Sequence, residues 1–277
     1  MRMAHHSVRN ALKAFAAALQ FLTRLPVPAR LAGAAHEDGD FRRSVAFFPA
    51  AGFVIGVLLA LAGWLLGSAL PPLVAAVLVT VLWIGVTGAL HMDGLMDTAD
   101  GLLSHRSRER MLEIMKDSRV GAMGVVAGTL AALLRAALLA SLLPGQGAFA
   151  AAVLTVVPVW SRAFLATAIA GWPYARADSG GGFGGLFRTV KAKHALAAAA
   201  LACLLTAAAL AVTDVWPFGQ AAVFLLAAAA VTYGAGSLLA ASASRKLGGL
   251  TGDVYGALNE CIELALLLAA VAYLYNS

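Results

Sequence analysis

Residues 45–68, "VAFFPAAGFVIGVLLALAGWLLGS", form an apolar run without a single charged side chain. A helix needs about 20 consecutive apolar residues to cross a bilayer, because each residue rises about 1.5 Å through a hydrocarbon layer about 30 Å thick. This run is long enough for one crossing. We predict that it is the first of several membrane-spanning helices.

Six further apolar runs follow, and turn formers such as "LPPL" (70–73) and "PGQG" (144–147) lie between them. The composition agrees, because 61% of the residues are hydrophobic and only 12% are charged, against about 25% charged in a soluble domain. We therefore predict an all-α fold, a polytopic transmembrane bundle of about seven spans in one integral-membrane domain over residues 1–277. The further spans are predicted at 72–91, 120–143, 148–172, 195–213, 219–242 and 260–275.

The segment before the first span has a different character. Apolar residues at helical spacing stand beside basic ones, and "TRLPVP" (23–28) ends any helix. This pattern predicts an interfacial amphipathic helix within a cytoplasmic N-terminal segment, residues 1–43. A cleaved signal peptide is not favoured, because a compact apolar core and a small-residue cleavage site are not well placed.

Basic residues are unevenly distributed between the two sides of the predicted bundle. If the spans alternate, the N-terminal segment and three long connections carry Lys and Arg on one side, whereas the short connections on the other side contain neither. The positive-inside rule predicts that the basic side is cytoplasmic. The net charge of +6 then reflects topology and contact with anionic lipid headgroups, and nucleic acid is not an expected partner. The long connections are 91–119, 173–194 and 243–259.

The first long connection, which we expect to hold an acidic active site, opens with "HMDGLMDTADG" (91–101). On a helix, Asp93, Asp97 and Asp100 fall within an arc of about 60°. Neighbouring carboxylates about 6 Å apart repel by roughly 3 kcal/mol at an effective dielectric near 20. Protons, basic partners or a hard divalent cation such as Mg²⁺ must therefore neutralise the cluster. The competing interpretation is a helix cap by Asp93, with the other aspartates solvated.

A fourth carboxylate follows in "RERMLEIMKDSRVGAMG" (108–124). Asp117 lies between the cations Lys116 and Arg119, at the start of the next span. It is either a fourth metal ligand or an ion-pair partner. Ser107 is expected to cap a short amphipathic helix just before it.

Two arginines lie inside predicted spans, where an exposed charge costs at least a few kcal/mol, so each should face the bundle interior. Arg162 is predicted either to contact a phosphate or to pair with Glu263. Arg135 is predicted to be structural.

The connection 174–194 combines five glycines with several basic residues. Such a loop either approaches a nucleotide phosphate closely or is a flexible linker. Because no strand precedes the glycines, a P-loop is not indicated.

Several blocks of the chain resemble, in order, the signature blocks of the cobalamin synthase family, adenosylcobinamide-GDP ribazoletransferase. The central aspartate block is long and specific, and the blocks extend from near the N-terminus to the last span. They are "FLTRLPVP" (21–28), "FFPAAGFVIG" (47–56), "HMDGLMDTADGL" (91–102), "RERMLEIMKDSRVGAMGV" (108–125), "WSRA" (160–163) and "GGLTGDVYGALNE" (248–260).

The resemblance implies that a ribose hydroxyl of α-ribazole, or of its 5′-phosphate, attacks the phosphorus on the cobinamide arm of adenosylcobinamide-GDP and releases GMP. It implies Mg²⁺ as cofactor, because metal ions neutralise charge in phosphoryl transfer. Asp100 or Asp117 is expected to accept the proton of the hydroxyl. The expected metal ligands are Asp93, Asp97, Asp100 and Asp117. The expected substrate-binding residues are Arg162, Lys116, Arg119, Asp253, Asn259 and Glu260. Packing or helix capping is the alternative role for the last three.

Three other classes of membrane protein fit the sequence less well. A CDP-alcohol phosphotransferase shares a similar aspartate motif, but an Ala-Arg pair stands there where this chain has Asp97-Thr98. A secondary transporter should show related halves, and the aspartate block is not repeated. A structural scaffold would not need clustered carboxylates. A homo-oligomer is compatible with the sequence.

Overall fold

A computed structural model gives the structure of the chain and describes residues 2–28, 31, 42–145, 147–176 and 189–276. Nearly all of these residues are helical. The helices are α1 (Arg2–Leu22), the 3-10 turn η2 (Val45–Phe47), α4 (Phe48–Ala69), α5 (Pro72–Thr87), α6 (Leu90–Leu102), α7 (Arg108–Ile114), α8 (Ala122–Leu142), α9 (Gly147–Gly171), α11 (Ala192–Thr213), α12 (Phe218–Leu247) and α13 (Gly252–Asn276).

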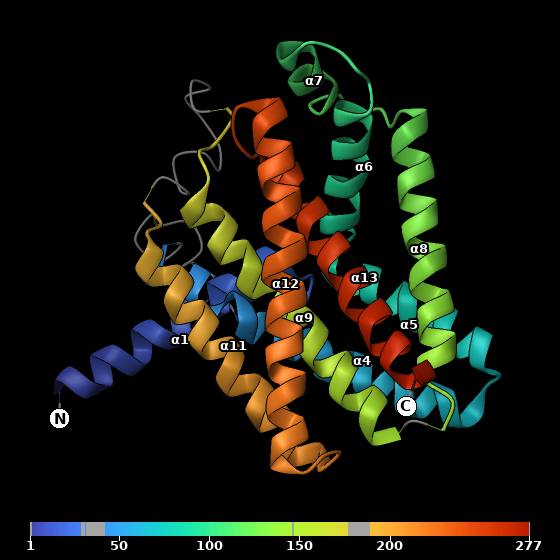
Figure 1. Cartoon of the computed structure of the whole chain (residues 1–277). Helices are drawn as coiled ribbons and strands as arrows, with labels where there is room; N and C mark the ends of the chain where they lie inside the picture. Colours follow the sequence, from blue (N-terminus) through green and yellow to red (C-terminus); the bar gives the residue numbers. More distant parts are fainter. Residues whose placement is uncertain (1, 29–30, 32–41, 146, 177–188, 277) are drawn as a thin grey trace.

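Within the described residues, six helices are long and apolar enough to cross a membrane, namely α4, α8, α9, α11, α12 and α13. Helices α5 and α6 pass the same test only together and are bent by 89° at the break between them. Helix α5 starts where α4 ends, and α6 ends at the other end of the bundle beside α7 and the start of α8 (Figure 1). The bent pair is therefore a candidate for a seventh crossing, and the predicted polytopic all-α bundle is confirmed.

Two predicted spans are wrong at one end. Within the span predicted at 72–91, helix α5 ends at Thr87 and helix α6 begins at Leu90. The last helix begins at Gly252, well before the predicted start at 260. The reason is that the acidic residues of 252–263 form ion pairs with arginines, so they did not need to lie outside a crossing.

The break between α5 and α6 has a local cause. Gly88 and Ala89 both adopt left-handed backbone conformations, with φ of 61° and 60°. The N–H of Arg24 donates to the Val86 carbonyl at 2.7 Å, which satisfies one of the acceptors that the end of α5 leaves open. A Cβ on Gly88 would lie 2.3 Å from Nε of Arg24. The segment that follows α1 therefore stabilises the break between α5 and α6, and with it the direction of α6 relative to α5.

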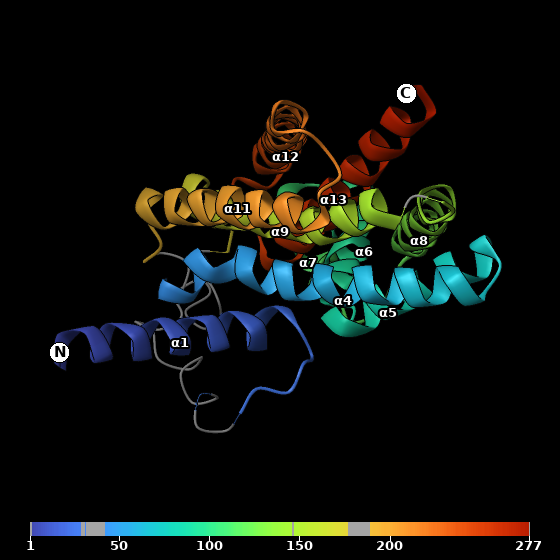
Figure 2. The ribbon, with the colours of Figure 1, turned by 90° about the horizontal axis from the view of Figure 1, so that it is seen from below.

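Helix α9 forms the centre of the bundle, since 89% of its most apolar stretch is buried. Helix α4 lies on one side of α9, and α12 lies on the other (Figure 2). At Gly52 the α4 backbone is so close to α9 that a Cβ would be 2.2 Å from the Pro158 carbonyl oxygen. Helix α1 packs on the outside of α4, where the rings of Phe21 and Phe48 stack at 5.7 Å. The predicted N-terminal helix is confirmed; its place at the membrane surface stays a prediction.

Candidate active site

The three aspartates of the central block, Asp93, Asp97 and Asp100, all lie on helix α6. Their spacing predicted that they would lie together on one helix. Ala89 is the residue before the first turn, so the interpretation of Asp93 as a helix cap is wrong. Asp93 is exposed, and Asp97 and Asp100 are half-buried. Helix α6 lies beside the start of α13 (Figure 1).

A close helix crossing adds a fourth carboxylate to this end of the bundle. A Cβ on Gly94 would lie 2.6 Å from the Asp253 carbonyl oxygen and 3.0 Å from the Cα of Gly256. The backbones of α6 and α13 therefore touch at this point. The charges of Asp93, Asp253 and Asp100 all act on Asp97, and the opposing charge comes from Arg176. Negative charge predominates around Asp97, which favours binding of a cation.

The sequence pointed to Arg176 only as one of several basic residues in the connection 174–194, which was predicted either to approach a phosphate or to be a flexible linker. Its Nη2 lies 2.9 Å from Oδ2 of Asp253. Two backbone hydrogen bonds hold it there: Ala175 N–H donates to the Leu250 carbonyl, and Leu250 N–H donates to the Pro173 carbonyl, each at 2.8 Å. The glycines of this connection and Arg188 lie outside the described residues.

Asp100 joins α6 to the start of α8. Its two carboxylate oxygens accept hydrogen bonds from the backbone N–H groups of Gly121 and Gly124, at 2.6 and 2.7 Å. A carboxylate at a helix N-terminus satisfies open donors and interacts favourably with the helix dipole. No such hydrogen bond reaches Asp93 or Asp97 from another described residue.

The two kinds of aspartate should therefore respond differently to amidation. We expect Asp100→Asn to lower the stability of the purified protein by about 1–2 kcal/mol, because an asparagine amide can accept only one of the two hydrogen bonds. Thermal unfolding in detergent, without substrate or metal, measures this effect. Asp93→Asn is the matched control and should unfold with the wild type. Equal unfolding temperatures for all three proteins would contradict the capping role.

Asp117 lies in the connection between α7 and α8. Its carboxylate accepts hydrogen bonds from the Arg119 side chain at 3.0 and 2.7 Å and from the Arg119 backbone N–H at 3.0 Å. These hydrogen bonds lower the pKa of Asp117 to about 2. Of its two predicted roles, the structure therefore contains the ion pair. Lys116 beside it is exposed.

The predicted Ser107 cap of α7 is confirmed, because the Arg110 N–H donates a hydrogen bond to the Ser107 hydroxyl oxygen at 3.4 Å.

Four buried charged side chains form an ionic network between α8, α9 and α13. Arg135 Nη2 lies 2.6 Å from Glu260 Oε2 and 3.0 Å from Glu263 Oε2. Arg162 donates to the other oxygen of Glu263. The four side chains are at most 4% exposed. Two positive and two negative charges balance, which makes their burial at membrane depth tolerable.

The network also reaches α5 and α6. Arg162 Nη2 lies 3.4 Å from Nδ1 of His91 on α6. The Arg135 guanidinium lies 4.7 Å from the centre of the Trp83 ring on α5, a cation–π contact. The ion pair between Arg162 and Glu263, one of the two predictions for Arg162, is thus present.

The predicted substrate-binding residues are not all brought together. Asp253 lies beside the aspartates of α6, whereas Glu260 and Arg162 lie in the buried network. Asn259 is fully buried, and neither atom of its amide has a hydrogen-bond partner among the described residues. Leaving such a group unpaired costs about 1–3 kcal/mol, so a bound polar ligand would relieve that cost.

The donor chemistry of this end of the bundle fits Mg²⁺, which prefers carboxylate oxygens together with phosphate oxygens. Among the described residues no three acidic, histidine or cysteine side chains are arranged as a complete metal site. Asp93 and Asp97 have carboxylates without hydrogen bonds from other described residues. A ligand set completed by substrate phosphates is the arrangement that these residues suit.

Comparison with known proteins assigns the chain to a family. A family model described as Cobalamin-5-phosphate synthase matches residues 14–271. A protein of Brevibacillus brevis named adenosylcobinamide-GDP ribazoletransferase is 40% identical over 268 residues, which cover 94% of this chain and 98% of that protein. A protein of the same name from Roseiflexus sp. is 42% identical over 250 residues, covering 90% of this chain and 86% of that protein. No solved structure matches this chain.

Proposed function

Because the chain belongs to the cobalamin-5-phosphate synthase family, we propose that it joins adenosylcobinamide-GDP to α-ribazole or its 5′-phosphate. The relatives' shared name specifies this class of transfer. A ribose hydroxyl oxygen forms a bond to the phosphorus on the cobinamide arm. The bond from that phosphorus to the GMP oxygen breaks, and GMP leaves with the electron pair. The products are adenosylcobalamin, or its 5′-phosphate, and GMP.

The observation that supports this proposal most is the contact of α6 with α13, which crowds carboxylates around Asp97 with Arg176 as the opposing charge. In this proposal Asp93 and Asp97 hold Mg²⁺. The ion would neutralise charge on the phosphate oxygens when bound. Arg176 is close enough to this face to attract the anionic substrate.

The proton acceptor is also assigned to this face. The sequence pointed to Asp100 or Asp117, yet the structure engages both oxygens of Asp100 with backbone amides and pairs Asp117 with Arg119. Protonation of either group would break those contacts. We therefore propose that Asp97, which is half-buried, accepts the proton through the carboxylate oxygen that does not bind the ion, and we give Asp100 a positioning role.

We propose that this face is cytoplasmic, in a bacterial inner membrane. The connections at the opposite end of the bundle, 70–71, 143–146 and 214–217, contain no Lys or Arg, whereas the basic residues of α7 and of the end of α12 lie at the aspartate end (Figure 1). The positive-inside rule supports this orientation.

Turnover by detergent-purified protein tests the proposal. With adenosylcobinamide-GDP, α-ribazole and Mg²⁺, we expect release of GMP together with a joined corrinoid, and loss of both when EDTA removes the metal. Restoration by added Mg²⁺ is the control for inactivation by the chelator. Failure to form product with any divalent ion, in protein that remains folded, would contradict the assignment. Turnover of a CDP-activated alcohol instead would support the phosphotransferase alternative.

A further inference from the structure

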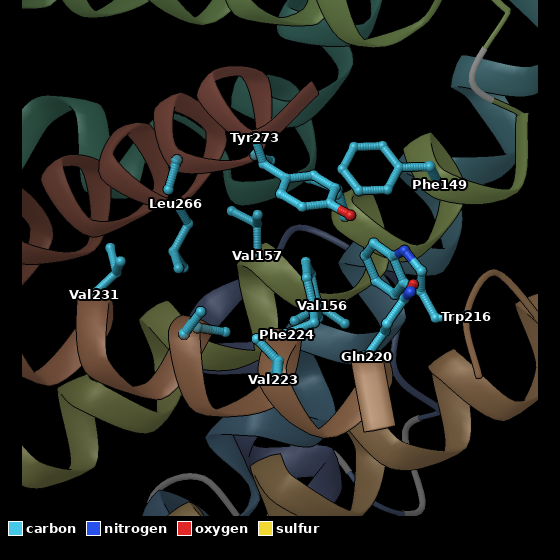
Figure 3. A pocket seen from close by; sticks show the side chains of 15 residues that line it. Phe149, Val156, Val157, Trp216, Gln220, Val223, Phe224, Val231, Leu266 and Tyr273 are labelled. Atoms are coloured by element: carbon cyan, nitrogen blue, oxygen red, sulfur yellow. The ribbon is translucent and has the colours of Figure 1, made fainter. Parts of the chain in front are cut away.

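A cavity of about 330 Å³ lies between α9, α12 and α13, with Trp216 of the α11–α12 connection at one end. Its walls are almost entirely apolar. Gln220, Trp216 and Tyr273 gather at one end, and Val231 and Leu266 lie at the other (Figure 3). The cavity thus has a mixed polar and aromatic end and an aliphatic end.

This cavity is separate from the aspartate face. Along α13, Leu266 is thirteen residues from Asp253, which corresponds to about 20 Å of helix. Tyr273 lies farther still. The residues that line the cavity therefore do not take part in the proposed phosphate site.

The depth of the cavity matches one leaflet of a bilayer. Trp216 precedes the first turn of α12, so this end lies at the membrane boundary, where Trp and Tyr are enriched. From Gln220 to Val231 the helix rises about 16 Å, and half of the hydrocarbon core is about 15 Å thick. The aliphatic end therefore reaches the middle of the membrane.

The cavity is also bordered by the helix that packs least against the rest of the protein. Only 17% of the most apolar stretch of α12 is buried, against 89% for α9. Helix α12 therefore faces lipid along most of its length. Apolar cavities do not hold water without polar partners, whereas a flexible hydrocarbon chain fills such a space.

From these observations we infer that the cavity binds one acyl chain of a membrane phospholipid. The chain enters in the leaflet opposite the aspartates, with its ester end beside Trp216, Gln220 and Tyr273 and its methyl end beside Val231 and Leu266. The lipid packs between α12 and the α9–α13 pair and joins α12 to the bundle.

Quenching of tryptophan fluorescence tests this inference. Detergent-purified protein is titrated with a phosphatidylglycerol whose acyl chains are brominated close to the ester, and the unbrominated lipid serves as the reference. We expect quenching that saturates, because bromine quenches Trp216 only on contact. In Trp216→Phe, the saturating component of the quenching curve should disappear. Any component that rises linearly with lipid should remain, because it arises from the exposed Trp64.

Matched variants distinguish the cavity from general lipid contact. Ala227→Phe places a ring in the cavity from α12, and Ala269→Leu fills it from α13, so that either variant can give the answer if the other folds poorly. We also expect the lipid to raise the unfolding temperature of the wild type, because it binds the folded protein. Both variants should lose this rise and the saturable quenching. Ala230→Phe, exposed on α12 outside the cavity, should keep both. Equal, non-saturating quenching in all proteins would overturn the inference, as would displacement of the lipid by adenosylcobinamide-GDP.

Discussion

Asp97→Asn is expected to reduce turnover by on the order of a thousandfold while leaving the unfolding temperature of the protein unchanged or higher. The loss follows from the proposed site, because a metal ligand supplies several kcal/mol of charge stabilisation and each 1.36 kcal/mol is a factor of ten. The stability follows from the structure. Asp97 receives no hydrogen bond from another described residue and lies in the field of Asp93, Asp100 and Asp253, so its amidation removes repulsion.

Initial rates with saturating Mg²⁺ and substrates measure the first effect, and thermal unfolding without ligands measures the second. Asp214→Asn is the matched control, because it makes the same chemical change at the opposite end of the bundle. Asp214 follows the last turn of α11 in a left-handed conformation, which asparagine tolerates. It should leave both quantities unchanged. Loss of activity together with a large fall in unfolding temperature would show that Asp97 is structural. Retention of activity would remove it from the site.

The sequence predicted the parts of the fold that single segments determine. Apolar runs of about twenty residues predict crossings because a bilayer tolerates few other structures. The three aspartates of α6 share a face because the helical period dictates it. The break at Gly88–Ala89 was missed, since Ala89 is not a turn former and the hydrogen bond from Arg24 joins parts of the chain more than sixty residues apart.

The parts of the site that depend on packing between helices could not be predicted in the same way. Arg135 is the common partner of Glu260 and Glu263 but lies far from both in the sequence. Arg176 is one of several basic residues in its connection, and the sequence does not distinguish it from the others. The backbone hydrogen bonds of residues 173–175 with Leu250 place it beside Asp253. Side chains that meet across helices carry no local signal of their partner.

Loss of one charge from the buried network is expected to have the second large effect. Arg162→Gln leaves two glutamates against Arg135, and Glu263→Gln leaves two arginines against Glu260. Breaking a buried ion pair by removing one partner costs about 3–5 kcal/mol, because an uncompensated charge stays behind. Either single variant should therefore yield little folded protein, which fluorescence-detected size exclusion of a tagged protein would show.

The double variant Arg162→Gln/Glu263→Gln should recover much of this loss, since Arg135 and Glu260 still balance each other and a neutral pair replaces the charged one. Arg110→Gln, in the exposed ion pair with Glu113, is the control for loss of an ion pair as such and should behave like the wild type. A double variant as unstable as the single ones would show that charge balance is not what the network supplies.

The same double variant decides between the two predictions for Arg162. If Arg162 only balances Glu263 and orients α6 through His91, the folded double variant should bind substrate with an unchanged KM and lose part of its kcat, because α6 carries the aspartates. If Arg162 instead contacts a phosphate, KM for adenosylcobinamide-GDP should rise with the protein equally stable. A charge-balanced variant separates these outcomes because unfolding no longer obscures the kinetics.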